Sequence, residues 1–120
     1  MVKFIIPVTV TGTRITVGTP VTEPTDESRN VFAVAFQTDE AWSGLTLTAI
    51  FEADKSSAGY LMASDNIAPI PPSVLSAKCK FLSVGLRGTD GDGNVLSSQM
   101  ANIYPIKRGA PLYDGGEDVD

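Results

Sequence analysis

The stretch that most constrains the fold is FQTDEAWSGLTLTAIF, residues 36–51, where two alternating apolar runs meet at a short acidic connection. Apolar side chains recur at every second position on both sides of it: Phe32, Val34 and Phe36 before, and Leu45, Leu47, Ala49 and Phe51 after. A period of two predicts a β-strand on each side. The connection, residues 37–44, is too polar and too short for a full helix. We therefore expect Trp42 to fold back from a turn and close one end of the core.

The amino-terminal segment predicts a hairpin. Even-numbered positions from 2 to 10 are apolar, residues 11–13 (TGT) form a turn, and residues 14–17 return as a second strand. Pro7 has no N–H to donate, so we expect the first strand to lie at a sheet edge or to carry a bulge there. Residues 18–30 predict a surface loop with one short strand near residues 20–22.

The second half of the chain continues this pattern of short strands and turns. Residues 60–63 predict a brief hairpin strand, the proline-rich residues 67–72 an extended segment, and residues 73–76 one helical turn capped by Ser73. Residues 81–87 predict a strand in which Gly85 marks a bulge or a close backbone approach. A turn at residues 89–94 then leads into a final strand pair, residues 95–106, interrupted near Asn102.

These elements together predict an all-β protein, because no segment carries the apolar stripe of a stable helix. The spacing of the strands favours a single immunoglobulin-like antiparallel β-sandwich over residues 1–111, with a small barrel as the alternative. Residues 112–120 add Gly-Gly and four acidic residues and predict a flexible or partner-docked tail. The core is expected to contain the apolar residues that are in phase on the strongest strands: Phe36, Trp42, Leu47, Ala49, Phe51, Val84 and Leu86.

Charge and cysteine content exclude several classes of partner. Nine basic residues against fourteen acidic ones give a net charge of −5, which argues against nucleic acid or an anionic membrane as the main partner. No apolar run approaches the ~20 residues of a membrane span. Cys79 is the only cysteine, so no intramolecular disulfide forms. With no signal-peptide pattern at the amino terminus, we expect synthesis in a reducing cytoplasm.

The sequence offers little catalytic chemistry. It contains no histidine, which removes the usual general base and the commonest metal ligand. Asp90, Asp92 and Asn94 resemble half of a calcium loop, but Val95 and Ala101 stand where such a loop needs glycine and glutamate. We therefore expect a hairpin turn there, no cofactor, no metal and no enzymatic activity.

A carboxylate beside an aromatic residue is also found in sugar-binding sites, and Asp39 and Glu40 lie beside Trp42. The alternative expectation is that Asp39 caps the turn while Trp42 packs into the core. A second function class stays open on this basis. It is a carbohydrate-binding sandwich that recognises a bacterial surface, with Trp42 or Tyr60 as the stacking platform.

Three segments, WSGLTLTAI, IPPSVL and SVGLRGTDGDGNVL, occur in an order that resembles a family of bacteriophage virion proteins. The chain is similar over roughly residues 3–111 to the amino-terminal immunoglobulin-like domain of upper baseplate and tail-fibre proteins. The matching positions are Trp42, Gly44, Leu45, Pro72, Val74, Leu75, Val84, Gly85, Leu86 and Gly88. The resemblance implies a non-enzymatic virion protein of the baseplate and tail-fibre type. A head-decoration or head-fibre subunit is equally compatible.

Such a protein is expected to bind other tail, baseplate or capsid proteins, to form a homo-oligomer, and to reside in the virion after synthesis in the bacterial host. The two ends of the chain are the expected contact regions. Ile5 points away from the face that Phe4 and Ile6 share, so a neighbouring subunit is expected to cover it, by strand addition or side-chain packing. Leu112 and Tyr113 follow the last strand and are the second expected contact.

Overall fold

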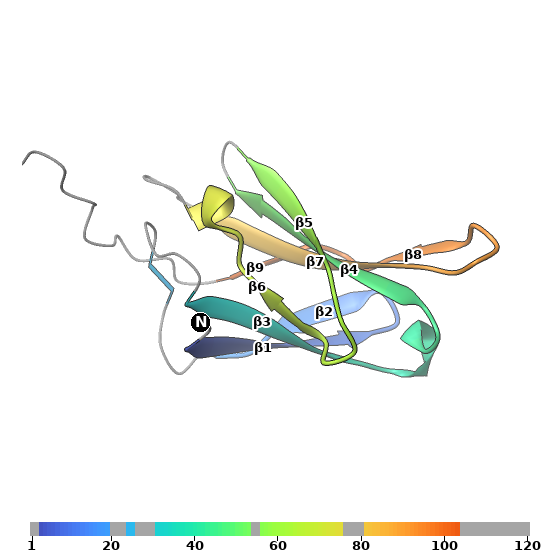
Figure 1. The fold of residues 1–120 in the computed structure, drawn as a ribbon. Coiled ribbons are helices and arrows are strands. Elements are labelled where there is room, and N and C mark those ends of the chain that lie inside the picture. Colours follow the sequence, from blue (N-terminus) through green and yellow to red (C-terminus); the bar gives the residue numbers. More distant parts are fainter. Residues whose placement is uncertain (1–2, 20–23, 26–30, 54–55, 76–80, 104–120) are drawn as a thin grey trace, which may run out of the picture.

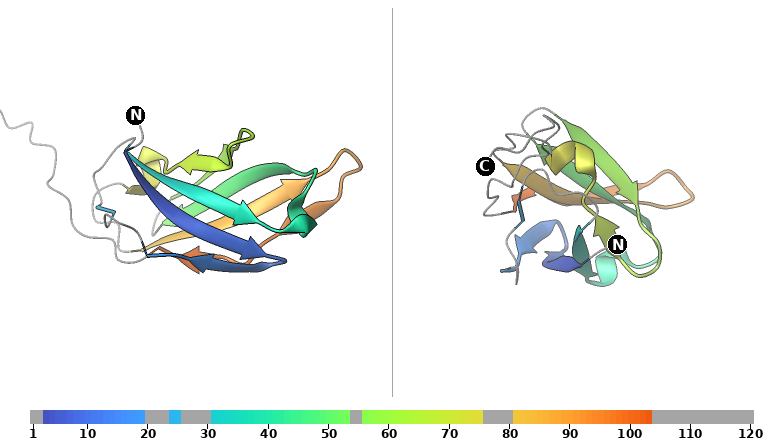
Figure 2. Two further views of the ribbon diagram at one scale, coloured as in Figure 1. Left: turned by 90° about the horizontal axis from the view of Figure 1, so that it is seen from below. Right: turned by 60° about the vertical axis from the view of Figure 1, so that its left-hand side comes forward.

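In the computed structural model, which describes residues 3–19, 24–25, 31–53, 56–75 and 81–103, two β-sheets pack face to face (Figures 1 and 2). The first sheet has the order β2-β1-β3-β6 and consists of β1 (Phe4–Thr11), β2 (Arg14–Val17), β3 (Phe32–Thr38) and β6 (Ile67–Pro69). The second has the order β5-β4-β7-β8, with β9 also paired to β7. It consists of β4 (Thr46–Ala53), β5 (Ser57–Leu61), β7 (Leu82–Thr89), β8 (Val95–Ser97) and β9 (Ala101–Asn102). The predicted all-β sandwich is confirmed.

One strand pair departs from the antiparallel expectation. β1 and β3 pair in parallel, with Phe4 opposite Phe32 and Val8 opposite Phe36. The cause is the preceding hairpin. β2 runs back along β1, so the chain after β2 continues toward the end of the sheet at which β1 begins. β3 therefore starts at the same end as β1 and runs in the same direction. All other pairs in the two sheets are antiparallel.

The expectation that Pro7 marks a sheet edge or a bulge is wrong, since β1 lies between β2 and β3 and pairs with β3 without interruption. Pro7 is tolerated because β2 ends beside it. The Gly18 amide, just beyond β2, donates to the Pro7 carbonyl at 2.7 Å. The N–H and C=O groups of one strand residue point to the same side. The N–H that Pro7 lacks would therefore point toward β2, at the position where the pairing with β2 stops. A Cβ on Gly18 would lie 2.9 Å from the Pro7 ring, which explains the glycine.

The core fills the space between the sheets, and its members come from both of them. The largest fully buried side chains include Trp42, Phe51, Ile6 and Ile70. Six of the seven residues predicted for the core are buried: Phe36, Trp42, Ala49, Phe51, Val84 and Leu86. The seventh, Leu47, packs against the core but is only half-buried. It lies near the beginning of β4, opposite Gly88 of β7.

The predicted turn between β3 and β4 contains a short 3₁₀ helix, η1 (Glu40–Trp42). Asp39 caps it by accepting a hydrogen bond from the Ala41 amide, and Trp42 turns inward and is 2% exposed. Both features agree with the sequence prediction. A second 3₁₀ helix, η2 (Pro72–Leu75), buries Val74 and Leu75 where one helical turn was expected.

The last strand is interrupted at Ser98–Met100, earlier than the predicted break near Asn102. Ser97 pairs with Arg87 and Ala101 with Val84, so three residues lie opposite two and form a β-bulge. The Ser98 hydroxyl takes part in the pairing by accepting from the Leu86 amide at 2.8 Å. The Gln99 amide donates to the Thr13 carbonyl at 2.8 Å and so ties the bulge to the β1–β2 turn of the other sheet.

Two sequence predictions fall outside the described residues. These are the short strand near residues 20–22 and the acidic tail, residues 112–120.

Candidate interaction surface

The side of the second sheet that faces away from the core is called here the outer face. The strand register places its side chains in rows. One row contains Leu61, Thr48, Arg87 and Ser97; a second contains Gly59, Ile50 and Gly85; a third contains Ser57, Glu52, Ser83 and Asn102. Thr89 and Val95 continue the face along the β7–β8 hairpin, which extends beyond the rest of the sandwich (Figure 1).

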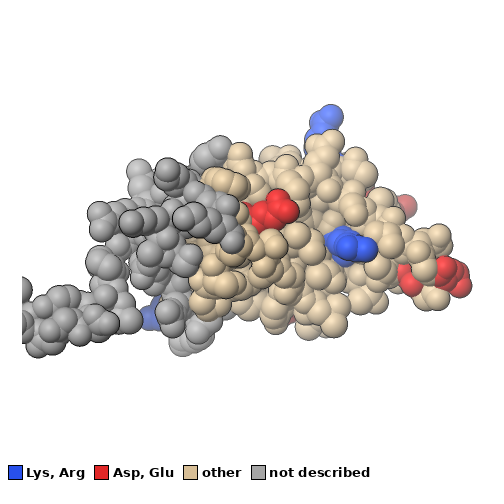
Figure 3. All heavy atoms as spheres, turned by 90° about the horizontal axis from the view of Figure 1, so that it is seen from above, with Lys and Arg blue, Asp and Glu red and all other residues tan. Residues whose placement is uncertain are grey.

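Exposed apolar side chains concentrate on this face. Of the six large hydrophobic residues exposed in the described part of the chain, four belong to it: Leu61 (65% exposed), Val95 (51%), Met100 (42%) and Phe81 (41%). Among the described residues of the outer face, only Glu52 and Arg87 carry charge. Figure 3 looks onto this side of the molecule and shows charged atoms sparsely placed on a broad uncharged surface. Large exposed apolar side chains gathered on one side of a molecule are typical of a binding region.

Two glycines shape the middle of the outer face. Gly59 and Gly85 stand on either side of Ile50 in one row. The Met100 thioether lies against Gly85 and occupies the space that a side chain there would need. The prediction for Gly85 is a bulge or a close backbone approach, whereas the nearest group is this side chain. On the other side, Thr48 Cγ2 lies 3.5 Å and Ile50 Cδ1 lies 3.7 Å from a Cβ built on Gly59, both at ordinary van der Waals distance.

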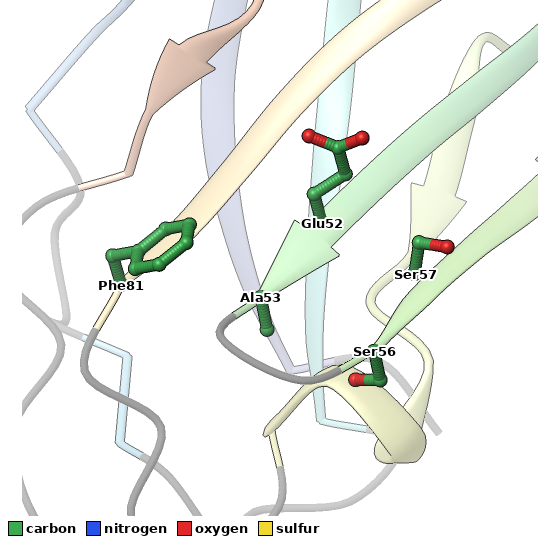
Figure 4. Close-up of a pocket in the computed structure, with 5 residues that line it drawn as sticks. All are labelled: Glu52, Ala53, Ser56, Ser57 and Phe81. Atoms are coloured by element: carbon green, nitrogen blue, oxygen red, sulfur yellow. The ribbon is translucent and has the colours of Figure 1, made fainter.

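An open hollow of about 390 Å³ adjoins the outer face where β4 ends and β5 and β7 begin. Figure 4 shows its lining, Glu52, Ala53, Ser56, Ser57 and Phe81. The Ser56 hydroxyl donates to the Ser73 carbonyl at 2.9 Å, so it links the start of β5 to η2. The hollow offers a shape for a partner side chain.

Three of the residues predicted for partner binding lie on β1 within the described part of the chain. Ile5 is 44% exposed and faces outward from the first sheet, on the opposite side of the molecule from the outer face. Phe4 is half-buried with its ring 5.3 Å from that of Phe32, and Ile6 is fully buried. β1 pairs with β3 from Phe4 onward, but its pairing with β2 begins only at Val8, so strand addition beside Ile5 stays a prediction. Leu112 and Tyr113 lie outside the described residues.

The sugar-binding alternative loses its first platform. Trp42 is 2% exposed and its indole Nε1 donates to the Gly12 carbonyl at 2.9 Å. No face of that ring is available for stacking. Tyr60, 38% exposed at the edge of the second sheet, is the remaining candidate.

The acidic turn after β7 is satisfied by its own hydrogen bonds. Asp90 Oδ1 accepts from the backbone amides of Asp92 (2.9 Å) and Asn94 (3.0 Å), and Oδ2 accepts from the Asn94 side-chain amide (2.9 Å). These bonds, led by the Asn94 side chain, lower the pKa of Asp90 below 3.8. The predicted hairpin turn is confirmed, with Gly93 at φ +87°. Within the described part of the chain, no group of three or more potential ligands is placed to hold a metal ion.

Comparison with family models, with curated proteins and with solved structures finds no match to this chain. The likeness to baseplate and tail-fibre domains therefore stays a prediction. Among the described residues, no helix is long and apolar enough to cross a membrane.

Sequence reasoning missed the outer face, although part of its signal was present. Ile50 stands in the polar phase of its strand, between Thr48 and Glu52. An apolar residue out of phase indicates a second apolar side on that strand. Its position between Gly59 and Gly85 depends on the register of three strands, which the sequence does not state.

Proposed function

We propose that this protein is a non-enzymatic structural domain that acts by binding other proteins through the outer face. The observation that carries the proposal is the concentration of exposed apolar side chains on one side of the molecule, with only two charges among them. A chain with a net charge of −5 gains solubility from charge spread over its surface. An uncharged face on such a chain is best explained by a partner that covers it.

The setting that we propose is a bacteriophage virion, which rests on the resemblance described above. In this setting the domain is a baseplate or tail-fibre attachment domain, or a head-decoration or head-fibre subunit. Repeated copies on a particle make individually weak contacts hold, so a modest apolar face is sufficient.

The proposal is tested by supplying a tagged copy of the protein during infection and counting copies per purified particle by quantitative mass spectrometry. The wild-type chain should be recovered with the particles. Val95→Lys combined with Met100→Lys should remove most of that occupancy, because each substitution places a charge on the outer face. Thr16→Lys is the matched control, since Thr16 is exposed on the first sheet.

Two results would contradict the proposal separately. Absence of the wild-type chain from particles would remove the virion setting. Occupancy unchanged by the double substitution would remove the outer face as the binding surface.

We propose the two chain ends as a second, smaller attachment. Ile5 is exposed on the first sheet, and Leu112 and Tyr113 follow in the sequence beyond the described strands. Ile5→Lys and deletion of residues 112–120 should each lower occupancy on the particle. Wild-type occupancy in both variants would show that the ends take no part.

A further inference from the structure

The edges of the two sheets differ in how well they are protected. β6 is three residues long and ends in Pro69, β8 is also three residues long, and β9 is two. β2 begins with Arg14 and lies beside β9 of the other sheet. β5 is a five-residue edge strand, SAGYL, without proline or charge, and four of its residues are exposed. Natural edge strands are usually protected from unwanted pairing by short length, by proline or by a charged residue, or are covered by a partner.

The hydrogen bonds between β4 and β5 show which backbone groups of β5 remain unpaired. The Ala53 amide donates to the Ser56 carbonyl at 2.8 Å, and the Met62 amide donates to the Leu47 carbonyl at 2.9 Å. Even-numbered residues of this strand therefore face β4, and the backbone groups of Ser57, Gly59 and Leu61 face away from it. No partner for these groups is found within the described chain.

We propose that β5 pairs antiparallel with β5 of a second copy of this chain, about a two-fold axis at Gly59. The unpaired groups occur symmetrically on either side of Gly59, so the same strand reversed presents matching donors and acceptors. Gly59 then pairs with Gly59 of the copy, and Ser57 pairs with Leu61. The two second sheets join into one continuous sheet, and both outer faces lie on the same side of it.

The side chains of β5 fit this register. Leu61, the most exposed large hydrophobic residue of the described chain, lies diagonally across from Gly59 of the copy. The absent side chains of the two glycines leave room for both Leu61 side chains to close over the centre. On the opposite side of the strand, Tyr60 stands opposite Ala58 of the copy, a small neighbour that leaves space for the ring.

The charge of β5 itself does not oppose pairing with a second copy. β5 carries no charged residue, so two acidic molecules can approach along this edge. The row of Leu61 contains Arg87 and the row of Ser57 contains Glu52. Pairing of Ser57 with Leu61 joins these two rows, but Arg87 and Glu52 of the copy then lie four strand spacings apart, roughly 19 Å, so their attraction is largely screened.

This inference rests on the proposed function and deepens it by naming one partner. It is tested on the purified protein alone, so its failure is distinguishable from failure to join a particle. Light scattering after size-exclusion chromatography, over a concentration series, should give twice the chain mass for the wild type. Gly59→Pro should give the monomer, because proline removes the central donor from the free edge while leaving the bonds to β4 in place. Thr16→Lys, at an exposed position on the first sheet, should remain dimeric.

Two further measurements keep the test decisive. Leu61→Asp removes the central apolar contact through a side chain that is already exposed, so it should give a folded monomer even if Gly59→Pro disturbs β5. In a Cys79→Ser background, Gly59→Cys should form a disulfide-linked dimer on mild oxidation, whereas Val95→Cys should not. A wild type that stays monomeric throughout the series would overturn the proposal. A dimer that survives both Gly59→Pro and Leu61→Asp would overturn it equally. So would an edge at β5 that binds an unrelated extended peptide but not a second copy.

Discussion

Trp42 and Gly12 are joined by a hydrogen bond that links the two sheets. The indole Nε1 of Trp42, in the connection leading to the second sheet, donates to the Gly12 carbonyl in the β1–β2 turn at 2.9 Å. The Gly12 amide in turn donates to Asp39 Oδ2 at 2.9 Å. Gly12 has φ +59°, a conformation that glycine adopts without strain. One glycine thus engages both the cap of η1 and the aromatic ring that closes the core.

Replacing Trp42 should separate its packing from its hydrogen bond. Trp42→Phe keeps an aromatic ring but leaves the Gly12 carbonyl without its donor, and should lower the free energy of unfolding by about 1–3 kcal/mol. Trp42→Ala also leaves a cavity and should cost about 3–5 kcal/mol. Urea titration followed by circular dichroism measures both. A change below about 1 kcal/mol for Trp42→Ala would show that the ring contributes little to the core.

Gly88 should be intolerant of even a methyl group. A Cβ there would lie 2.8 Å from Leu45 Cδ1 and 3.2 Å from Trp42 Cε3, so the ring and its neighbour would have to move. Gly88→Ala should therefore destabilise the protein by about 1–3 kcal/mol. Gly91→Ala is the control, because no atom lies within 4 Å of the added carbon. Equal melting temperatures for the two variants would contradict the packing described here.

The sequence predicted individual strands well because a period of two depends only on which residues are buried, and Phe36, Ala49 and Phe51 follow it. The order of strands depends on the end of the sheet at which the chain emerges from each hairpin. This is why the parallel β1–β3 pair and the central position of Pro7 were missed. The outer face was missed for a related reason: Ile50 meets Gly59 and Gly85 only after three strands have been aligned. The actual free edge, β5, was expected only as a brief strand at residues 60–63.

The fluorescence of Trp42 should report a core residue and should ignore sugars. With the ring 2% exposed, emission should be blue-shifted relative to free tryptophan and unchanged by bacterial surface glycans. Binding of a glycan, measured by calorimetry and abolished by Tyr60→Ala, would instead support the carbohydrate-binding alternative. Phe4→Ala, a half-buried aromatic on the other sheet, serves as the comparison variant in that experiment.

The pKa of Asp90 should lie below 3.8 in the folded protein, because the side-chain amide of Asn94 and the backbone amides of Asn94 and Asp92 stabilise the carboxylate. A folded-state pKa below that of the unfolded chain means that the ionised form favours the folded turn. That contribution is complete at pH values above the unfolded pKa and is lost as the pH falls through the folded value. Titration of the Asp90 carboxyl carbon by nuclear magnetic resonance measures this directly. Asn94→Ala removes the largest cause of the shift and should raise the pKa toward 3.8. A pKa of Asp90 that is the same in the wild type and in Asn94→Ala would show that these hydrogen bonds do not persist in solution.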